Sequence, residues 1–312
     1  MKVYNLNSRS NFKEQNLCLT IGNFDGIHKG HQLIINEIIL NSNSDLYKSA
    51  VMSFTPHPRI FFDHSKEVIN ILTKEEKLKI LKEMGIQIYI DFIFDENLSN
   101  LSAEDFIKKI IITKLNTKKI IVGSDFRFGK NRTGDIEILK SLSKELDFQL
   151  IKIDTVNKEN SNTKYSSSYI RELIKGGSFE KVSQILGRNW NIKGKVIEGD
   201  QRARQNNFPT ANIKPQNTIL PKKGVYCVKA LVGENIYNGI SNFGFRPTVN
   251  GSLLLLETHL FDFNEDIYGK ELTVEFQAFI RSEQKFENFE ELTKQIKKDI
   301  NKAKKYHKIY GI

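Results

Sequence analysis

Residues 17–31 of the chain read LCLTIGNFDGIHKGH, an apolar run that ends in a glycine-containing turn before a helical pattern. In the helical pattern, apolar residues recur on one face over residues 30–40, where we expect Leu33, Ile34 and Ile38 to be buried. The stretch therefore predicts a buried strand that leads directly into a helix.

The same alternation continues through the first half of the chain. Three further runs have the length and composition of strands: 50–54, 87–94 and 119–123. A capping box of Thr73 and Glu76 opens one intervening helix, which ends at Gly85, and another helix begins near Ser102. Strands that alternate with helices indicate βαβ units and a parallel sheet with helical cover.

The pattern changes after residue 186. Five strand-like runs are separated there by Gly, Pro and Asn turns: 192–197, 224–231, 236–242, 253–261 and 271–280. They indicate an antiparallel barrel or sandwich, followed by a helix over residues 288–307. The apolar face of this helix consists of Leu292, Ile296, Ile300 and Ala303. We therefore expect two domains, 1–186 and 187–312.

The composition is that of a globular protein, with 39% hydrophobic and 27% charged residues in a chain of 312. No run reaches the roughly 18 apolar residues that cross a bilayer, and residues 1–19 lack the apolar core of a signal peptide. We therefore expect a cytoplasmic protein without a membrane partner. Cys18 and Cys227 lie in strand-like runs, so we expect buried thiols without a disulfide. The net charge of +10 favours acidic partners such as nucleotides, polyphosphates or nucleic acid.

The turn from Gly22 to His31 has the features of a phosphate site. Its glycines let a ligand approach the backbone, and the free N–H groups of the following helix point toward that ligand. His28 and His31 add two imidazoles three residues apart. Two surface histidines or a partial metal site are the alternatives, and Asp25 is the one nearby carboxylate that could complete a metal site.

This turn resembles the signature of the HIGH-type nucleotidyltransferases, in the form found in bacterial bifunctional FAD synthetases. The resemblance extends over the whole chain through four further motifs: FTPHP at 54–58, GSDFRFG at 123–129, SSSYIR at 166–171 and FPTAN at 208–212. It implies an α/β Rossmann-like HIGH-type nucleotidyltransferase domain followed by an antiparallel β-barrel flavokinase domain with a C-terminal helix.

For the first domain the resemblance implies adenylyl transfer from ATP to FMN, which gives FAD and pyrophosphate. The implied catalytic residues are His28, His31 and Arg171, which would stabilise the developing charge. The implied ATP contacts are Gly22, Phe24, Asp25, Gly30, Ser167 and Ser168. Flavin contacts are implied at Pro56, His57, Pro58 and Asp125, and at Arg281 in a stretch that matches the kinase module. The serines also fit the cap of a helix whose N–H groups meet phosphate, while Arg171 supplies a planar donor fork.

For the second domain the resemblance implies transfer of the γ-phosphoryl group of ATP to riboflavin, which gives FMN and ADP. Glu257 stands at the position of the general base. The implied ATP contacts are Gly199, Arg204, Thr210 and Asn212. The hydroxyl of Thr210 and the carbonyl of Asn212 are hard oxygen ligands of the kind that Mg²⁺ prefers. We expect a monomer or a weak homo-oligomer.

One departure from the family pattern affects the kinase. The loop over residues 199–207 is usually glycine-rich, but here Gln201, Ala203 and Asn207 replace three glycines. A Cβ atom restricts close approach of the backbone to phosphate. An FMN adenylyltransferase with weakened or lost kinase activity is therefore the alternative function.

Two other classes of protein are less compatible with the sequence. An aminoacyl-tRNA synthetase would need an anticodon-reading region, whereas the residues after 187 carry kinase motifs. A nucleic-acid-binding barrel would need aromatic residues among exposed lysines and arginines. Tyr226, Phe243 and Phe261 instead lie in apolar runs, so we expect no nucleic-acid partner.

Overall fold

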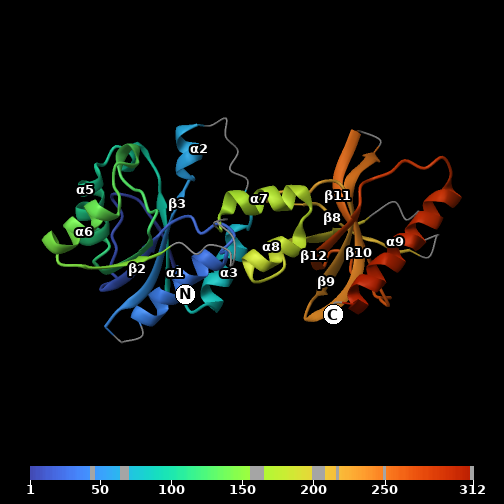
Figure 1. Ribbon diagram of the computed structural model, residues 1–312, viewed down its shortest axis with the longest axis horizontal. Coiled ribbons are helices and arrows are strands. Elements are labelled where there is room, and N and C mark those ends of the chain that lie inside the picture. The colour runs from blue at the N-terminus through green and yellow to red at the C-terminus, as the bar shows by residue number, and fades with distance from the viewer. Residues whose placement is uncertain are drawn as a thin grey trace. The chain divides into compact units, whose positions relative to one another are not determined.

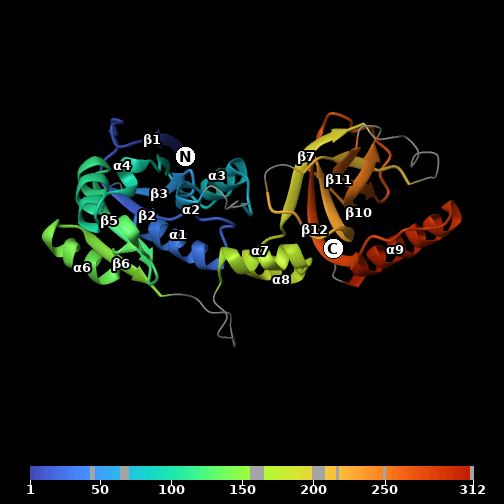
Figure 2. The same cartoon turned by 90° about the horizontal axis from the view of Figure 1, so that it is seen from above.

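The computed structural model describes residues 1–42, 46–63, 70–154, 165–198, 208–215, 218–248 and 251–309. The chain divides into two compact units, Met1–Ser167 (unit 1) and Ser168–Ile312 (unit 2) (Figures 1 and 2). In the part of the chain described, no helix is both long enough and apolar enough to span a membrane.

Unit 1 is built on a six-stranded sheet in which every neighbouring pair of strands is parallel, in the order β1-β4-β3-β2-β5-β6. The strands are β1 (Lys2–Leu6), β2 (Leu17–Ile21), β3 (Lys48–Thr55), β4 (Ile88–Ile93), β5 (Thr117–Gly123) and β6 (Gln149–Ile153). This confirms the predicted parallel α/β fold and adds β1 and β6, which the sequence reading did not include.

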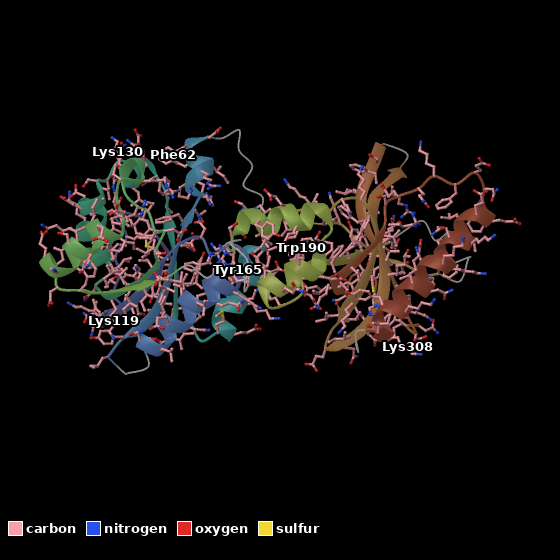
Figure 3. The ribbon with its side chains drawn as sticks, in the orientation of Figure 1. Phe62, Lys119, Lys130, Tyr165, Trp190 and Lys308 are labelled. Carbon is pink, nitrogen blue, oxygen red and sulfur yellow. The ribbon has the colours of Figure 1, made fainter. Side chains whose placement is uncertain are left out.

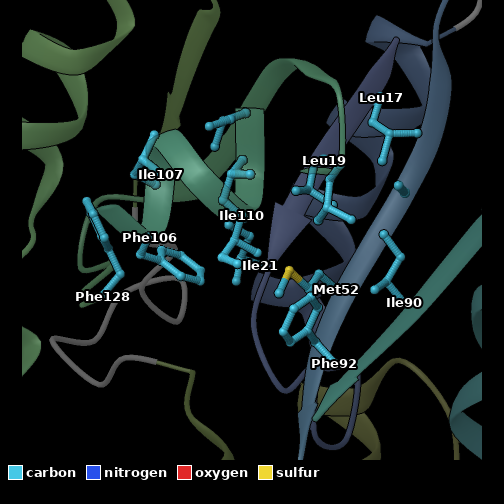
Figure 4. Packing of buried hydrophobic residues seen from close by; sticks show 14 of the residues in the cluster. Leu17, Leu19, Ile21, Met52, Ile90, Phe92, Phe106, Ile107, Ile110 and Phe128 are labelled. Carbon is cyan, nitrogen blue, oxygen red and sulfur yellow. The ribbon is translucent and has the colours of Figure 1, made fainter. Parts of the chain in front are cut away.

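Helices cover both faces of this sheet (Figure 1). They are α1 (Lys29–Asn41), α2 (Pro58–Phe62), α3 (Lys74–Glu83), α4 (Glu96–Ser99), α5 (Ala103–Asp105), the π-helix η1 (Phe106–Lys114), the 3₁₀ turn η2 (Lys130–Arg132) and α6 (Ile136–Glu145). Phe106, Ile107 and Ile110 of η1 pack against Leu19 and Ile21 of β2 in the main core (Figure 4). The alternate residues of β2 face the other side, where α1 lies.

The helix boundaries largely follow the sequence pattern. The capping box of Thr73 and Glu76 is present, and both of its hydrogen bonds form. Gly85 ends α3 with a φ of +98°, a conformation that glycine adopts without strain. On α1 the prediction for Leu33 is wrong, because this side chain is 42% exposed. Ile38 is fully buried, as predicted, and the other fully buried residue of this face is Ile35, about one turn before it.

Unit 2 contains a closed antiparallel barrel in the strand order β10-β11-β8-β7-β12-β9, with two helices before it and one after it. The elements are α7 (Ser167–Gly176), α8 (Phe179–Leu186), β7 (Asn191–Ile197), β8 (Ala211–Ile213), β9 (Gly224–Val232), β10 (Asn235–Thr248), β11 (Gly251–Leu260), β12 (Glu271–Arg281) and α9 (Phe289–Ile309). The structure thus resolves the choice between barrel and sandwich and confirms the C-terminal helix.

Two groups of buried side chains hold unit 2 together. Phe179 of α8 stacks on Trp190 with 5.5 Å between ring centroids, and it also contacts Phe276 at 4.8 Å (Figure 3 labels Trp190). Under α9, Ala303 packs against Cys227 and its apolar neighbours. Both cysteines of the chain are buried free thiols, as the sequence predicted.

The compact unit 2 begins earlier in the chain than the predicted second domain. We expected the second domain to begin at residue 187, whereas the compact unit begins at Ser168 and includes α7 and α8. Phe179 is only 2% exposed, so α8 contributes to the core of unit 2. Independent folding of residues 187–312 stays a prediction.

We predict that a fragment of residues 168–312 unfolds at a higher temperature than a fragment of residues 187–312. Loss of a buried phenylalanine ring costs about 3–5 kcal/mol in a packed core. Circular dichroism during heating measures the difference, and Phe179→Ala in the longer fragment is the matched control. Equal unfolding temperatures for all three proteins would show that α8 does not stabilise the barrel.

Candidate active sites

The turn between β2 and α1 lies where the strand order of unit 1 reverses. β2 pairs with β3 on one side and with β5 on the other. In open parallel sheets, ligands bind at the carboxyl ends of the strands at such a switch point. Residues 22–28 follow β2 there, and the GSDFRFG motif follows β5.

The backbone of this turn is unusual. Phe24, Gly26 and Ile27 have φ values of +47°, +85° and +40°. For residues other than glycine this conformation costs roughly 1–3 kcal/mol and persists when the surroundings enforce it. The side chains of Phe24 and Ile27 are buried, at 3% and 0% exposure, and so anchor the turn in the core.

His28 and His31 form a stacked pair at the start of α1. Their ring centroids are 3.7 Å apart, and the ring planes differ by 16°. His28 is the N-cap residue, and its Nδ1 accepts a hydrogen bond of 3.3 Å from the backbone N–H of His31. An accepting ring nitrogen carries no proton, so neutral His28 carries its proton on Nε2. A Cβ atom on Gly30 would lie 3.2 Å from the His28 ring, so a larger residue there would crowd the pair.

His31 is half-buried, and besides its stacked partner it makes an edge contact with Phe24, with 5.1 Å between the ring centroids. Burial holds the pKa of His31 well below its usual value, and the nearby His28 and Lys77 lower it further. The ring is therefore neutral at pH 7 and offers a hydrogen-bonding group rather than a positive charge. Its Nδ1 has no hydrogen-bond partner among the described residues.

Two charged side chains, half-buried Lys77 and buried Asp25, connect the turn to the neighbouring structure. Lys77 of α3 donates from Nζ to the carbonyl of Asn23 at 2.8 Å, and Asp25 accepts at Oδ1 from the backbone N–H of Ile71 at 2.9 Å. Burial lowers the pKa of Lys77, and the carboxylates of Asp25 and Asp91 oppose that shift. Asp25, which the resemblance implies as an ATP contact, thus also supports the backbone of the turn. The sequence reading missed Lys77.

The serine motif contributes to the same turn. Ser167 donates from Oγ to the carbonyl of Asp25 at 2.8 Å, so it stabilises the loop that carries His28. Ser168 and Arg171 lie on α7 and belong to unit 2. The roles of Ser168 and Arg171 at the histidine pair remain predictions.

The residues implied for flavin binding in unit 1 follow β3 and β5. Pro56, His57 and Pro58 form the start of α2, and His57 caps this helix by accepting at Nδ1 from the backbone N–H of Arg59 at 3.1 Å. Asp125 is exposed after β5.

An aromatic cluster that the sequence reading did not assemble lies beside this helix start. Its members come from the ends of β3 and α2 and from the residue after β4: Phe54, Phe61, Phe62 and Phe94. Phe62 is 67% exposed on α2 (Figure 3), so the cluster presents an aromatic ring to solvent.

We predict that unit 1 loses stability as the pH falls from about 6.5, because the pKa of His31 is lowered and its protonation is unfavourable in the folded state. A pKa lowered by folding means that the unfolded chain binds more protons, so stability rises with pH in this range. The unfolding temperature should therefore fall less between pH 7.5 and pH 5.5 in His31→Gln than in the parent.

Two other groups with shifted pKa values must be separated from the effect of His31 in this measurement. Hydrogen bonds from Lys2 and Lys48 hold the pKa of Glu14 at about 2. The stabilisation that this carboxylate contributes is therefore lost only below about pH 4.5. Buried His307 in unit 2 also has a lowered pKa and remains in both proteins. An identical pH dependence in parent and variant would contradict a neutral His31 with a lowered pKa.

In unit 2 the predicted kinase residues are neighbours across three strands. Glu257 of β11 lies directly opposite Asn212 of β8 and opposite Asn242 of β10. Directly opposed residues place their side chains on the same face of a sheet. The register therefore brings together the general base and the metal ligand that the resemblance implies, and it adds Asn242.

The polarity of this group fits a bound cation. Asn212 is 3% exposed, and its Oδ1 has no hydrogen-bond partner among the described residues. The Glu257 side chain is 30% exposed, and its Oε1 lies 4.0 Å from Nη1 of Arg246. A buried carbonyl oxygen without a donor is a group that a hard metal ion satisfies.

These residues line a cleft of about 1420 Å³ within unit 2. Thr210, Asn212 and Glu257 contribute from the barrel, whereas Ile296 and Asp299 contribute from α9. Ligand pockets commonly measure about 300–1,000 Å³, so this cleft has room for more than one small molecule.

Arg281 also lines the cleft and is held by a buried carboxylate. Its Nε donates to Oδ2 of Asp299 at 2.8 Å, and Asp299 is 2% exposed. Gln295 donates to the other oxygen of Asp299 at 2.8 Å. Gly199 and Arg204, the remaining residues implied for ATP binding, lie outside the described residues, as does the whole loop 199–207.

Two family profiles match the chain. One, described as FAD synthetase, matches residues 10–169, and the other, described as riboflavin kinase, matches residues 186–307. A protein of Haemophilus influenzae named bifunctional riboflavin kinase/FMN adenylyltransferase is 36% identical over 293 residues, which cover 94% of each chain. A protein of the same name from Buchnera aphidicola subsp. Acyrthosiphon pisum is 38% identical and covers 96% of this chain and 97% of its own.

A solved structure has the same fold over nearly the full length. It is described as a macrolide-efflux protein from Streptococcus pneumoniae and is similar with a TM-score of 0.87 at 29% identity. The similarity covers 97% of this chain and 98% of that one. The arrangement of an α/β unit followed by a barrel is therefore shared with a protein of known structure.

Proposed function

The chain belongs to the family of bifunctional riboflavin kinase/FMN adenylyltransferases, and we propose that unit 2 phosphorylates riboflavin and unit 1 adenylylates the resulting FMN. The observation that most supports this assignment is the presence of one candidate site in each unit. Each site brings together residues that are distant in sequence and that suit one of the two reactions.

In the kinase reaction, Glu257 accepts the proton of the riboflavin 5′-hydroxyl, whose oxygen attacks the γ-phosphorus of ATP. The bond to the β-phosphate oxygen breaks, and ADP leaves. The register that places Glu257 beside Asn212 supports this role, because it puts the base next to the cation site. Thr210 and Asn212 would hold Mg²⁺, which when bound neutralises charge on the phosphates of the nucleotide.

In the adenylyl transfer, a phosphate oxygen of FMN attacks the α-phosphorus of the second ATP, and pyrophosphate leaves. The attacking phosphate is already ionised, so no general base is required. The N–H groups at the start of α1 and the Nε2–H of His28 then donate to the phosphate oxygens as charge develops. Arg171 is proposed to supply a further donor fork.

The flavin ring of FMN needs an apolar surface near these donors. We assign it to the helix start at Pro56, His57 and Pro58 together with the aromatic cluster that contains Phe54 and Phe62. Aromatic rings that face solvent at the carboxyl ends of parallel strands suit a planar ligand. Asp125 remains a candidate flavin contact in unit 1, and Arg281, which lines the cleft of unit 2, remains one for the kinase site.

The alternative, an adenylyltransferase with weakened kinase activity, depends on the loop 199–207. A direct comparison separates the two functions: FAD formation is measured from riboflavin and, separately, from FMN, both with ATP and Mg²⁺. The bifunctional enzyme forms FAD from both flavins. Formation from FMN alone would favour the alternative.

We predict that His28→Asn lowers FAD formation from FMN by about 10²–10³-fold, while riboflavin phosphorylation stays unchanged. Asparagine can still cap α1 by accepting from the helix N–H, but it lacks the imidazole ring and its Nε2–H. Chromatographic separation of riboflavin, FMN and FAD measures both rates in one assay. Equal losses of the two activities in folded protein would contradict the assignment of His28 to unit 1 alone.

We predict that Glu257→Gln slows riboflavin phosphorylation by about 10²–10⁴-fold, the usual contribution of a general base. FAD formation from FMN should remain at the parental rate. Glu234→Gln, which removes an exposed carboxylate in the turn between β9 and β10, is the matched control. Normal turnover of Glu257→Gln would show that Glu257 has no role in proton transfer.

A further inference from the structure

His259 occupies a place in the kinase cleft that the reaction above does not use. It follows Glu257 by two residues on β11, so the two side chains lie on the same face of the strand. It lines the cleft, and its Nδ1 lies 2.9 Å from the carbonyl oxygen of Pro209. Pro209 immediately precedes Thr210, one of the two residues that would hold the metal.

The chemistry of this contact fixes the proton. A backbone carbonyl only accepts hydrogen bonds, so Nδ1 of His259 must carry the hydrogen. That holds for both the neutral and the protonated ring. The contact therefore does not depend on the protonation state of His259.

The contact begins where the strand ladder ends. β8 pairs with β11 from Ile213 to Ala211, and the last pair is Ala211 with Thr258. Thr210 lies just beyond that pair. Pro209 has no N–H and cannot donate to a ladder. The side chain of His259 thus reaches past the end of the strand pairing and holds the backbone next to Thr210.

Ring packing keeps His259 in this orientation. Phe208 contacts it edge-on with 5.9 Å between ring centroids, and Phe261 does so at 5.8 Å. Phe208 belongs to the same segment as Pro209, so His259 contacts the FPTAN motif through both its ring and its Nδ1–H.

We propose that His259 is a positioning residue of the kinase: its Nδ1–H fixes the Pro209 carbonyl and thereby sets the place of the Thr210 hydroxyl relative to Asn212. This inference rests on the proposed kinase function of the cleft. Loss of the hydrogen bond then weakens the hold on Mg²⁺, while turnover at saturating Mg²⁺ persists because Glu257 is untouched.

Two substitutions separate the hydrogen bond from the ring. His259→Asn keeps an N–H group near the position of Nδ1 and removes the ring, whereas His259→Phe keeps an aromatic ring and removes the donor. The full chain is assayed for riboflavin phosphorylation over a range of Mg²⁺ concentrations. We expect His259→Phe to raise the Mg²⁺ concentration for half-maximal rate by about 3- to 10-fold, the effect of one hydrogen bond. The kcat of His259→Phe at saturating Mg²⁺ should stay within about twofold of the parent. For His259→Asn, both the Mg²⁺ requirement and kcat should stay within about twofold of the parent, a smaller change than the loss of such a bond causes.

Each other outcome overturns the proposal. A parental Mg²⁺ requirement in His259→Phe would show that the bond positions nothing, and an equal defect in His259→Asn would assign the effect to the ring. A large loss of kcat at saturating Mg²⁺ would make His259 a substrate contact. A parent enzyme that forms FAD from FMN but does not phosphorylate riboflavin would instead reject the kinase function itself.

A second measurement does not require a folded variant. The ¹⁵N resonances of the His259 imidazole in the parent report which nitrogen carries the proton. We expect a protonated Nδ1 at neutral pH. A neutral ring with its proton on Nε2 would exclude the hydrogen bond to Pro209 and the proposal with it.

Discussion

The geometry of unit 1 depends on the tight turn by which the chain leaves β2 and enters α1. Two residues other than glycine, Phe24 and Ile27, hold a left-handed backbone there because their side chains are buried. The turn places His28 at the cap of α1, and the cap hydrogen bond in turn places the proton of a neutral His28 on Nε2. Lys77 and Ser167 hold the same turn through backbone carbonyls. A strained loop supported from several sides is a typical way to pre-organise donors for phosphate.

In unit 2 the positions of the candidate site residues are set by strand register instead of a turn. A one-residue slip of β8 against β11 would move Asn212 to the opposite face from Glu257. The closed barrel fixes that register, since each strand is paired on both sides. The two sites therefore rely on different constraints.

The sequence predicted the elements whose local pattern is strong. The capping box at Thr73 opens α3, and the periodic face of α9 is present. β8 was not predicted because a strand of three residues is too short to show a hydrophobic period. β6 was not predicted because buried and exposed residues do not alternate cleanly along it. Of the predicted site residues, Asn212 and Glu257 lie opposite each other in the barrel of unit 2. In unit 1, His28 stacks on His31, and the roles of these residues stay predictions. Lys77 and His259 could not be found this way, because their partners lie far away in the sequence and are set by tertiary packing.

The central claim is that two independent sites act in turn on one flavin, with FMN passing between them. Complementation tests it most directly: His28→Asn and Glu257→Gln proteins are each incubated with riboflavin, ATP and Mg²⁺, alone and mixed. The account predicts that His28→Asn alone stops at FMN, that Glu257→Gln alone leaves riboflavin unchanged, and that the mixture forms FAD after a lag in which FMN accumulates. A mixture that forms no FAD, although each variant keeps its one activity, would contradict the account.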